Sequence, residues 1–288
     1  MSYFIIFACN AFVVWQKSGN FAGVKRRKLN IILLMMGKIQ GLKRRVKVLV
    51  LPAMLLISAT MRAENRWTMT PDGGIRWTVG EGLPHEDHIE MSGRRVSTVL
   101  RYGVAADGSL LMNKSMVWPM LRTIPNNTHA SLMRRFAWDA VRDIVVSGAR
   151  VTVERVESIG LNHGVMTVSS RLPEAGLRLT RRYFPSTSLP MLVERYCLQN
   201  DGQRDVTVEL PCTHIIYQTP AEQGVRGSYT LVCRTEVKHP GAVLKPGESV
   251  EFDACIQAYS EGKGEKEFTL DAEAEEQARH SLASELQE

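Results

Sequence analysis

The stretch LPHEDHIEMSGRRVSTVLRYGVAADGSLLMNKSMVWPMLRTIPNNTHA, residues 83–130, decides the fold class. Residues 96–102 alternate apolar and polar side chains, which is typical of a strand with one buried face. Residues 106–109 (ADGS) then carry a turn signal, and residues 110–121 return as a second long strand. Two strand-like runs joined through Asp-Gly predict a β-hairpin.

The chain that follows keeps this period of two almost everywhere. Asn, Asp, Gly and Pro separate short runs, and no helical period intervenes between them. Short strands at this spacing are typical of an antiparallel sandwich. We therefore predict an all-β fold, a large antiparallel β-sandwich (supersandwich) over residues 64–268. Further strands are expected at residues 150–158, 164–171, 177–184, 191–199, 205–210, 229–238 and 249–259.

The N-terminal region has a different composition, with 11 Lys and Arg and no Asp or Glu in residues 1–63. A basic cluster at residues 43–47 precedes an apolar run at residues 48–57 and small residues up to Ala63. This order predicts a secretory signal peptide over residues 35–63, with cleavage near Ala59 or Ala63. The apolar run has about ten residues where a bilayer crossing needs roughly 20. We expect a periplasmic or secreted protein with no stable membrane anchor.

Met35 and Met36 are suitably placed to start such a signal peptide. Residues 1–34 are then interpreted as an upstream extension from a misassigned start codon. The alternative is a genuine hydrophobic segment at residues 4–15.

Removing this leader reverses the charge balance. The whole chain has 36 Lys and Arg against 30 Asp and Glu, whereas residues 64–288 keep 25 against 30, a net charge of −5. A basic surface is the usual electrostatic sign of nucleic-acid binding. Because the excess lies in the leader, nucleic acid is not expected as a partner.

Four cysteines lie beyond the leader, at positions 197, 212, 233 and 255. An exported compartment permits disulfides, and four cysteines allow three pairings. Their spacing matches no zinc motif, and all four fall in apolar strand-like runs, which favours buried free thiols. No glycine-rich phosphate loop, nucleophile elbow or Cys-x-x-Cys is present, and neither a cofactor nor a metal is predicted.

The C-terminal segment, residues 269–288, is rich in Ala and Glu and lacks Gly and Pro beyond residue 271. It predicts a helix with a narrow apolar side made of Ala272, Leu282 and Leu286. A polar helix in this position is interpreted as a linker to an absent domain.

Three phrases carry a family resemblance: LTRRYFPS at residues 179–186, MLVERYCLQN at residues 191–200 and LKPGE at residues 244–248. With residues 103–122, they resemble the N-terminal galactose-mutarotase-like supersandwich of bacterial six-hairpin glycoside hydrolases, over most of residues 66–288. In that family a helical linker joins the sandwich to an (α/α)6 barrel, which usually holds the catalytic acid and base. The resemblance therefore implies an oligosaccharide or polysaccharide ligand and a barrel partner, in cis or as a split product. It implies no catalytic residue here, and we expect the chain alone to hydrolyse nothing.

The first candidate site is the ionisable cluster His85, Asp87, His88 and Glu90. On a helix, the two histidines could share a metal with a carboxylate; on a strand, residues three apart face opposite ways. Structural hydrogen bonding of the imidazoles and contact with sugar hydroxyls are the other two hypotheses. Glu86 and its acidic neighbours could also supply one carboxylate of a glycosidase pair, although adjacent acids in a loop are more often solvated.

The second candidate site contains Trp118, Arg122, Asn126 and His129. A Trp ring can stack on a pyranose, and Arg and Asn can bind hydroxyls or a uronate carboxylate. The alternative is a core Trp beside an Asn-rich turn. For function, the alternatives are a stand-alone carbohydrate-binding or sugar-epimerising module and a structural periplasmic protein, because fold alone does not separate them.

Overall fold

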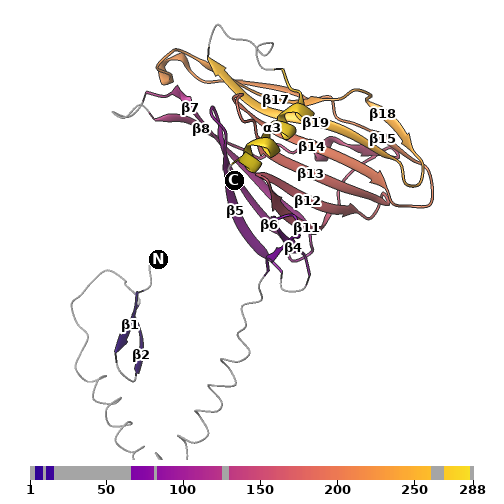
Figure 1. Cartoon of the computed structure of the whole chain (residues 1–288), viewed down its shortest axis with the longest axis horizontal. Coiled ribbons are helices and arrows are strands. Elements are labelled where there is room, and N and C mark those ends of the chain that lie inside the picture. The colour runs from indigo at the N-terminus through magenta and orange to yellow at the C-terminus, as the bar shows by residue number, and fades with distance from the viewer. Residues whose placement is uncertain are drawn as a thin grey trace, which may run out of the picture. The chain divides into compact units, whose positions relative to one another are not determined.

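The computed structural model describes residues 4–8, 11–15, 66–80, 83–124, 130–260 and 269–285 of the chain (Figure 1). The chain divides into two units, residues 1–64 and 65–288. In the first unit, β1 (Phe4–Ala8) and β2 (Ala11–Trp15) form an antiparallel hairpin. The predicted signal peptide, residues 35–63, lies outside the described residues. Among the residues that are described, no helix is long and apolar enough to cross a bilayer.

The second unit is built on a nine-stranded antiparallel sheet in the order β16-β17-β19-β14-β13-β12-β11-β4-β3. Side chains alternate between its two faces, as the period of two requires. Its strands are β3 (Thr68–Met69), β4 (Ile75–Thr78), β11 (Arg155–Asn162), β12 (Val165–Leu172), β13 (Leu177–Pro185), β14 (Met191–Asn200), β16 (His214–Gln218), β17 (Tyr229–Glu236) and β19 (Ser249–Ser260).

Two four-stranded sheets pack on one face of this large sheet, which we call its inner face. One is the β5-β6-β7-β8 sheet, and the other has the order β10-β9-β15-β18. Their strands are β5 (His85–Ser92), β6 (Ser97–Val104), β7 (Leu110–Arg122), β8 (Ser131–Phe136), β9 (Val145–Val146), β10 (Ala149–Arg150), β15 (Val206–Glu209) and β18 (Gly241–Leu244).

Each small sheet shares its own hydrophobic cluster with the large sheet. Leu100 and Trp118 of the β5–β8 sheet pack in one cluster with Val168 and Leu231. In the other cluster, strands β9, β15 and β18 and the short helix η2 (Ala140–Asp143) pack against β13, β14 and β19. The layered arrangement of two small sheets on one large sheet makes this an all-β sandwich, as predicted.

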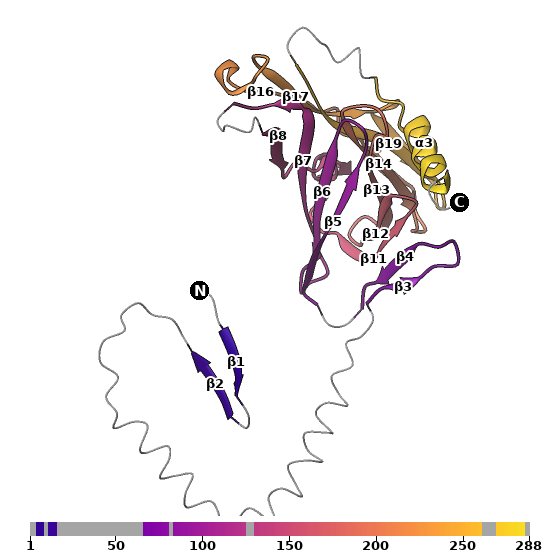
Figure 2. The same cartoon turned by 60° about the vertical axis from the view of Figure 1, so that its left-hand side comes forward.

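The single α-helix of the described residues, α3 (Ala272–Glu285), covers part of the opposite, outer face of the large sheet. Figure 2 shows β5 and β6 on one side of β12–β14 and α3 on the other. The predicted apolar side is wrong: Ala272 is buried, but Leu282 is 38% exposed, and Leu286 lies outside the described residues. The helix instead buries two charged residues, Glu276 and Arg279.

The predicted hairpin is confirmed, with β6 and β7 paired in register from Val104–Leu110 to Ser97–Val117. Its turn closes through a hydrogen bond from the Ala105 amide to the Ser109 carbonyl. Gly108 has φ +83°, a conformation that glycine adopts without a steric penalty. The Asp-Gly pair therefore forms the turn because its glycine accepts the positive φ that the turn requires.

The strand predicted at residues 150–158 is displaced: β10 ends at Arg150, and β11 runs from Arg155 to Asn162. Between them the chain leaves the sheets, and in this segment Glu154 reaches the buried Arg181. β11 then pairs with β4 and β12, with a register shift between Val156 and Ser158. Pairing with the next strand and with the distant β4, rather than the local Val pattern, sets where this strand begins.

All four cysteines of the described residues are free thiols. Cys233 belongs to the inner cluster and Cys255 to the outer one, so the sheet separates their side chains. Bringing them together would require a one-residue slip of a buried strand, which would turn every side chain of that strand over. Cys212 departs from the prediction, because it is exposed and lies between β15 and β16.

Candidate functional site

The ionisable cluster lies on β5, an edge strand of the β5–β8 sheet. Side chains alternate along β5, so His85 points toward the core with Ile89 and Met91. His88 points outward, on the same side as Glu86 and Glu90. The two imidazoles therefore lie on opposite sides of the sheet, as the strand alternative predicted. The described residues contain no group of three or more His, Cys, Asp or Glu side chains arranged to hold a metal.

His85 is held by an aromatic cluster rather than presented to solvent. Its ring packs edge-on against Trp77 at 5.2 Å, and Arg66 donates a hydrogen bond to its Nδ1. Burial, together with the Arg66 charge, lowers the pKa of His85, and the nearby Asp87 opposes this shift. A neutral ring accepting at Nδ1 carries its proton on Nε2. These contacts agree with the hypothesis that this imidazole has a structural role.

Asp87 lies beside the same cluster, at the position paired with Tyr102. Burial raises the pKa of Tyr102 to about 12, with the Asp87 charge adding to the effect and the Arg66 charge opposing it. The Asp87 side chain is 45% exposed and also accepts a hydrogen bond from the His88 amide at 2.8 Å. Asp87 therefore joins the structural cluster to the outer surface of the sheet.

That outer surface carries a polar hollow of about 470 Å³, which we call the outer-sheet hollow. The register places its outward side chains in rows across the strands: His88, Arg101 and Asn113 form one row. Glu90, Val99, Ser115 and Arg135 form the next. The hollow is lined by Glu86, Asp87, His88, Val99, Arg101, Asn113, Ser115 and Arg135.

Glu86 and Arg101 form an ion pair at one side of the hollow, with Arg101 Nε donating to Glu86 Oε2 at 3.1 Å. Gly103 makes room for this pair, because a Cβ there would lie 2.7 Å from the Glu86 side chain. Any larger residue at position 103 would have to displace Glu86. The glycine is thus a steric requirement of this side of the hollow.

Two charged groups near the hollow have no hydrogen-bond or ion-pair partner among the described residues. They are the carboxylate of Glu90 and the guanidinium of Arg135, at opposite ends of one row and three strand spacings apart. At about 4.8 Å per strand, their backbones are roughly 14 Å apart. The small side chains of Val99 and Ser115 lie between them. This arrangement can hydrogen-bond an extended, hydroxyl-rich ligand along its length.

The carboxylates do not form an evident glycosidase pair. Glu86 and Glu90 face the same way on one strand, but four residues separate their backbones by about 13 Å. Retaining enzymes place their carboxyl groups about 5–5.5 Å apart and inverting enzymes about 6.5–9.5 Å apart. Glu86 is also engaged by Arg101.

The second candidate site is corrected at Trp118, whose ring is fully buried. Its Nε1 donates a hydrogen bond to the Pro190 carbonyl at 2.9 Å, and its ring packs edge-on against Phe136. A ring in this position belongs to the core and cannot stack on a sugar. The core alternative for this Trp is therefore the correct one.

Arg122 is exposed at the far end of β7, where its carbonyl accepts a hydrogen bond from the Tyr229 hydroxyl at 2.6 Å. Nine residues of strand separate it from Asn113 in the hollow, or roughly 30 Å. Arg122 therefore does not join the outer-sheet hollow. The other two members of this predicted site, Asn126 and His129, lie outside the described residues.

The sequence analysis missed a buried charged layer between the two inner clusters. Lys114 Nζ donates to both oxygens of Glu194, at 2.7 and 2.9 Å, and both side chains are almost fully buried. Arg181 is equally buried and pairs with Asp139 and Glu154. One sequence signal could have revealed this layer: a charged residue at a position where the alternation of the strand points side chains into the core. Arg181, between Leu179 and Tyr183 on β13, is such a residue.

The Arg181 charge offsets the cost of burial within this layer. Burial would raise the pKa of Asp139, but the Arg181 charge and hydrogen bond, with help from Lys114, hold it below its usual range. Burial is likewise the main reason that the pKa of Tyr183 lies far above its ordinary value. The charges of this layer are paired with one another inside the sandwich, which indicates a role in packing.

Comparisons with known proteins gave structural likenesses alone. No family model matches the sequence, and no curated protein matches it. A GH36 alpha-galactosidase from Geobacillus stearothermophilus, solved with 1-deoxygalactonojirimycin, is similar at a TM-score of 0.33 and 10% identity over 61% of this chain. Its complex with raffinose gives 0.32 and 10% over 60%. A candidate kojibiose phosphorylase from the human microbiome gives 0.37 and 10% over 76%. The chain spans 41%, 41% and 36% of the chains in these three structures.

Proposed function

We propose that this protein is the saccharide-binding β-sandwich part of an exported carbohydrate-active enzyme of the glycoside hydrolase class. The outer-sheet hollow carries the proposal, because it combines a carboxylate, an amide, a hydroxyl, an imidazole and a guanidinium on one open sheet face. Such groups bind sugar hydroxyls through directional hydrogen bonds. The sequence resemblance to six-hairpin glycoside hydrolases supports the same ligand class.

Within the hollow, the rows of side chains suggest how a sugar chain lies. Glu90, which lies beside the hollow at one end of its row, accepts from hydroxyls, and Arg135 donates at the other end. Asn113 and Ser115 come from the central strand between them and can both donate and accept. We place the ligand across the strands, along the row from Glu90 to Arg135.

In the complete enzyme, the sandwich would pack against a catalytic barrel and contribute loops to the sugar cleft. It would act by positioning substrate, and the chain by itself would hydrolyse nothing. An isolated sandwich that binds without cleaving is consistent with a hollow whose two outward glutamates are about 13 Å apart along β5.

The test is to screen the full chain against immobilised oligosaccharides and to measure each hit by calorimetry. Glu90→Gln and Arg135→Gln should each weaken binding about tenfold, as expected for loss of a hydrogen bond to a charged group. The matched controls are Glu222→Gln and Arg226→Gln, which remove the same charges from exposed positions far along the chain. A chain that binds no glycan, or binds as well after both substitutions in this row, would overturn the proposal. A panel of aryl glycosides incubated with the same chain should remain uncleaved.

A further inference from the structure

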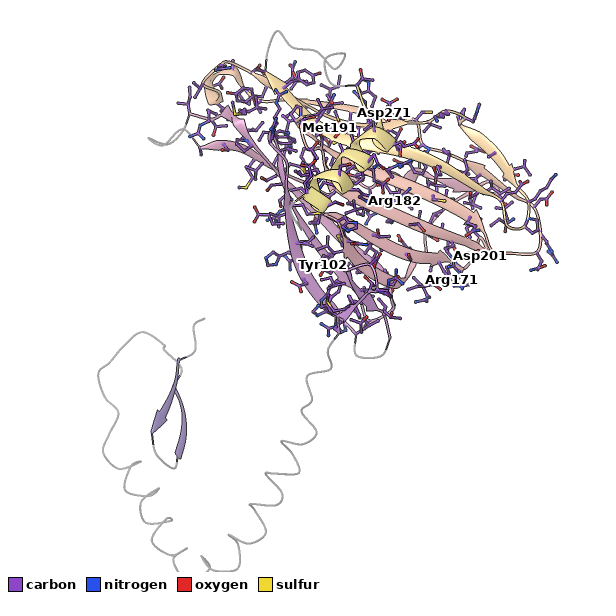
Figure 3. The ribbon with its side chains drawn as sticks, in the orientation of Figure 1. Tyr102, Arg171, Arg182, Met191, Asp201 and Asp271 are labelled. Atoms are coloured by element: carbon purple, nitrogen blue, oxygen red, sulfur yellow. The ribbon has the colours of Figure 1, made fainter. Side chains whose placement is uncertain are left out.

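A second hollow lies between α3 and the outer face of the large sheet. It has a volume of about 240 Å³, and strands β4, β11, β12 and β13 form its floor. Arg76, Gly160, Thr167 and Arg182 lie in one register row across those four strands. We call it the α3 groove; Figure 3 shows Arg182 beside the helix.

Three hydroxyl-bearing side chains of β11 and β12 face the α3 groove. Ser158, Thr167 and Ser169 all line it and are half-buried. None of the three hydroxyls has a hydrogen-bond partner within the part of the chain that the structure describes. Gly160 adds no side chain to the same floor, which keeps the space open. Three hydroxyls that face a hollow on neighbouring strands can donate to and accept from a ligand that is rich in hydroxyl groups.

The acidic groups of the groove are already engaged. Asp72 accepts a hydrogen bond from Asn162 Nδ2 at 2.6 Å, and a hydrogen bond from the Thr70 hydroxyl helps to lower its pKa. Glu276 on α3 pairs with Arg195 Nη1 at 2.6 Å and with Arg182 Nη1 at 3.3 Å. Glu276 is therefore paired with two cations, and Asp72 accepts from a neutral amide.

Arg76, in contrast to the two carboxylates, is a charged group of the groove without a hydrogen-bond partner among the described residues. Its side chain is exposed at the edge of the groove and makes no hydrogen bond or ion pair among the residues described here. It is close enough to Asp72 to contribute to the lowered pKa of that carboxyl group. A guanidinium with free donors is geometrically matched to a planar carboxylate, which it can bind through two parallel hydrogen bonds.

The geometry points to the α3 groove as a binding site for a carboxylate-bearing sugar, of the uronate class. Arg76 binds the carboxylate, and the hydroxyls of Ser158, Thr167 and Ser169 bind the ring hydroxyls. His280 of α3 and His163, whose rings are 5.7 Å apart, form the wall at the helix side. This site is on a different sheet from the outer-sheet hollow and stands independently of the proposed function.

The experiment is calorimetric titration of the full chain with D-glucuronate, D-glucose and acetate, each at the same ionic strength. Glucuronate should bind saturably, and glucose and acetate should each bind at least tenfold more weakly. Arg76→Gln should weaken glucuronate binding about tenfold or more, and Ser169→Val about two- to tenfold. The thermal midpoint of each variant should stay near that of the parent chain, which separates lost binding from lost folding.

Arg171→Gln is the matched control, because it removes the same charge from the same sheet face outside the groove. Arg171 pairs with Glu157 and lies farther along the sheet from α3 than Arg182 (Figure 3). Its affinity for glucuronate should stay within twofold of the parent. Absence of saturable glucuronate binding, equal binding of acetate, or equal losses in Arg76→Gln and Arg171→Gln would each overturn the assignment. Substitutions in the outer-sheet hollow should leave glucuronate binding in the groove unchanged.

Discussion

Lys114 of β7 and Glu194 of β14 form a buried ion pair between the β5–β8 sheet and the large sheet, with Lys114 Nζ 2.7 and 2.9 Å from the two carboxylate oxygens. The Tyr196 hydroxyl donates to the same carboxylate, so Glu194 is saturated by partners from its own strand and from β7. The pair lies where the two hydrophobic clusters meet: Leu192 belongs to one cluster and Tyr196 to the other. The ion pair therefore sets the position of β7 relative to β14 where the two sheets pack.

Removing one partner of this pair should be strongly destabilising. Lys114→Met leaves Glu194 charged and buried, and we expect the free energy of unfolding to fall by about 3–5 kcal/mol in urea denaturation. The double variant Lys114→Met with Glu194→Gln should recover part of that loss. Arg101→Met, which breaks the exposed pair with Glu86, is the control and should cost about 1 kcal/mol or less. A single Lys114 variant as stable as the control would contradict the role given to the pair.

Asp139 should make the fold sensitive to acid. Its pKa is held below the ordinary 3.8, although burial opposes this, because Arg181 favours the charged form. A lowered pKa contributes stability above the unfolded-state value, and that stability is lost as the pH falls through the folded-state value. Urea midpoints should therefore decrease below about pH 4. Asp139→Asn should be less stable at neutral pH, and its urea midpoint should decrease less steeply as the pH falls. An unchanged slope would show that the Asp139 carboxyl does not cause the loss of stability in acid.

The described thiols should differ in reactivity. Burial raises the pKa of Cys233 and of Cys255 to about 12, so little thiolate forms at neutral pH. Cys212 is exposed. We expect an aromatic disulfide reagent to modify Cys212 in the native protein and to reach Cys233 and Cys255 after denaturation in urea. Peptide mapping by mass spectrometry identifies the modified positions. Native modification of Cys233 at the rate of Cys212 would show that the core opens there.

Helix α3 should depend on one carboxylate for its attachment. Glu276→Gln removes the negative charge that pairs with both Arg182 and Arg195. Those two cations are directly opposite each other on β13 and β14, so they then lie side by side without that charge between them. Amide hydrogen exchange in residues 272–285 should become about tenfold faster or more. Glu273→Gln is the control on the same helix, since Glu273 is exposed. Equal exchange in the two variants would show that the apolar contacts of Ala272 and the hydrogen bonds from Arg279 to the Ser92 and Gly164 carbonyls suffice to hold the helix.

Much of the strand pattern could be predicted because it depends on local chemistry. The 96–121 hairpin follows from alternation and an Asp-Gly turn, and the structure confirms it in register. The prediction for residues 150–158 was wrong because β11 is defined by pairing with the next strand, β12, and with β4, which lies far earlier in the chain. The helix was placed well, at residues 272–285, but its buried side was not. Its partners are charges on the sheet, which no helical periodicity of apolar residues can indicate.

The candidate site divides in the same way. By itself the sequence determined that His85 and His88 face opposite sides if β5 is a strand, because side chains alternate along any extended backbone. Only the tertiary structure decided that Trp118 is buried and that Glu90 and Arg135 lie in one row. The physical reason is that alternation is a property of one strand, whereas burial and convergence depend on which strands pair and on what covers each face.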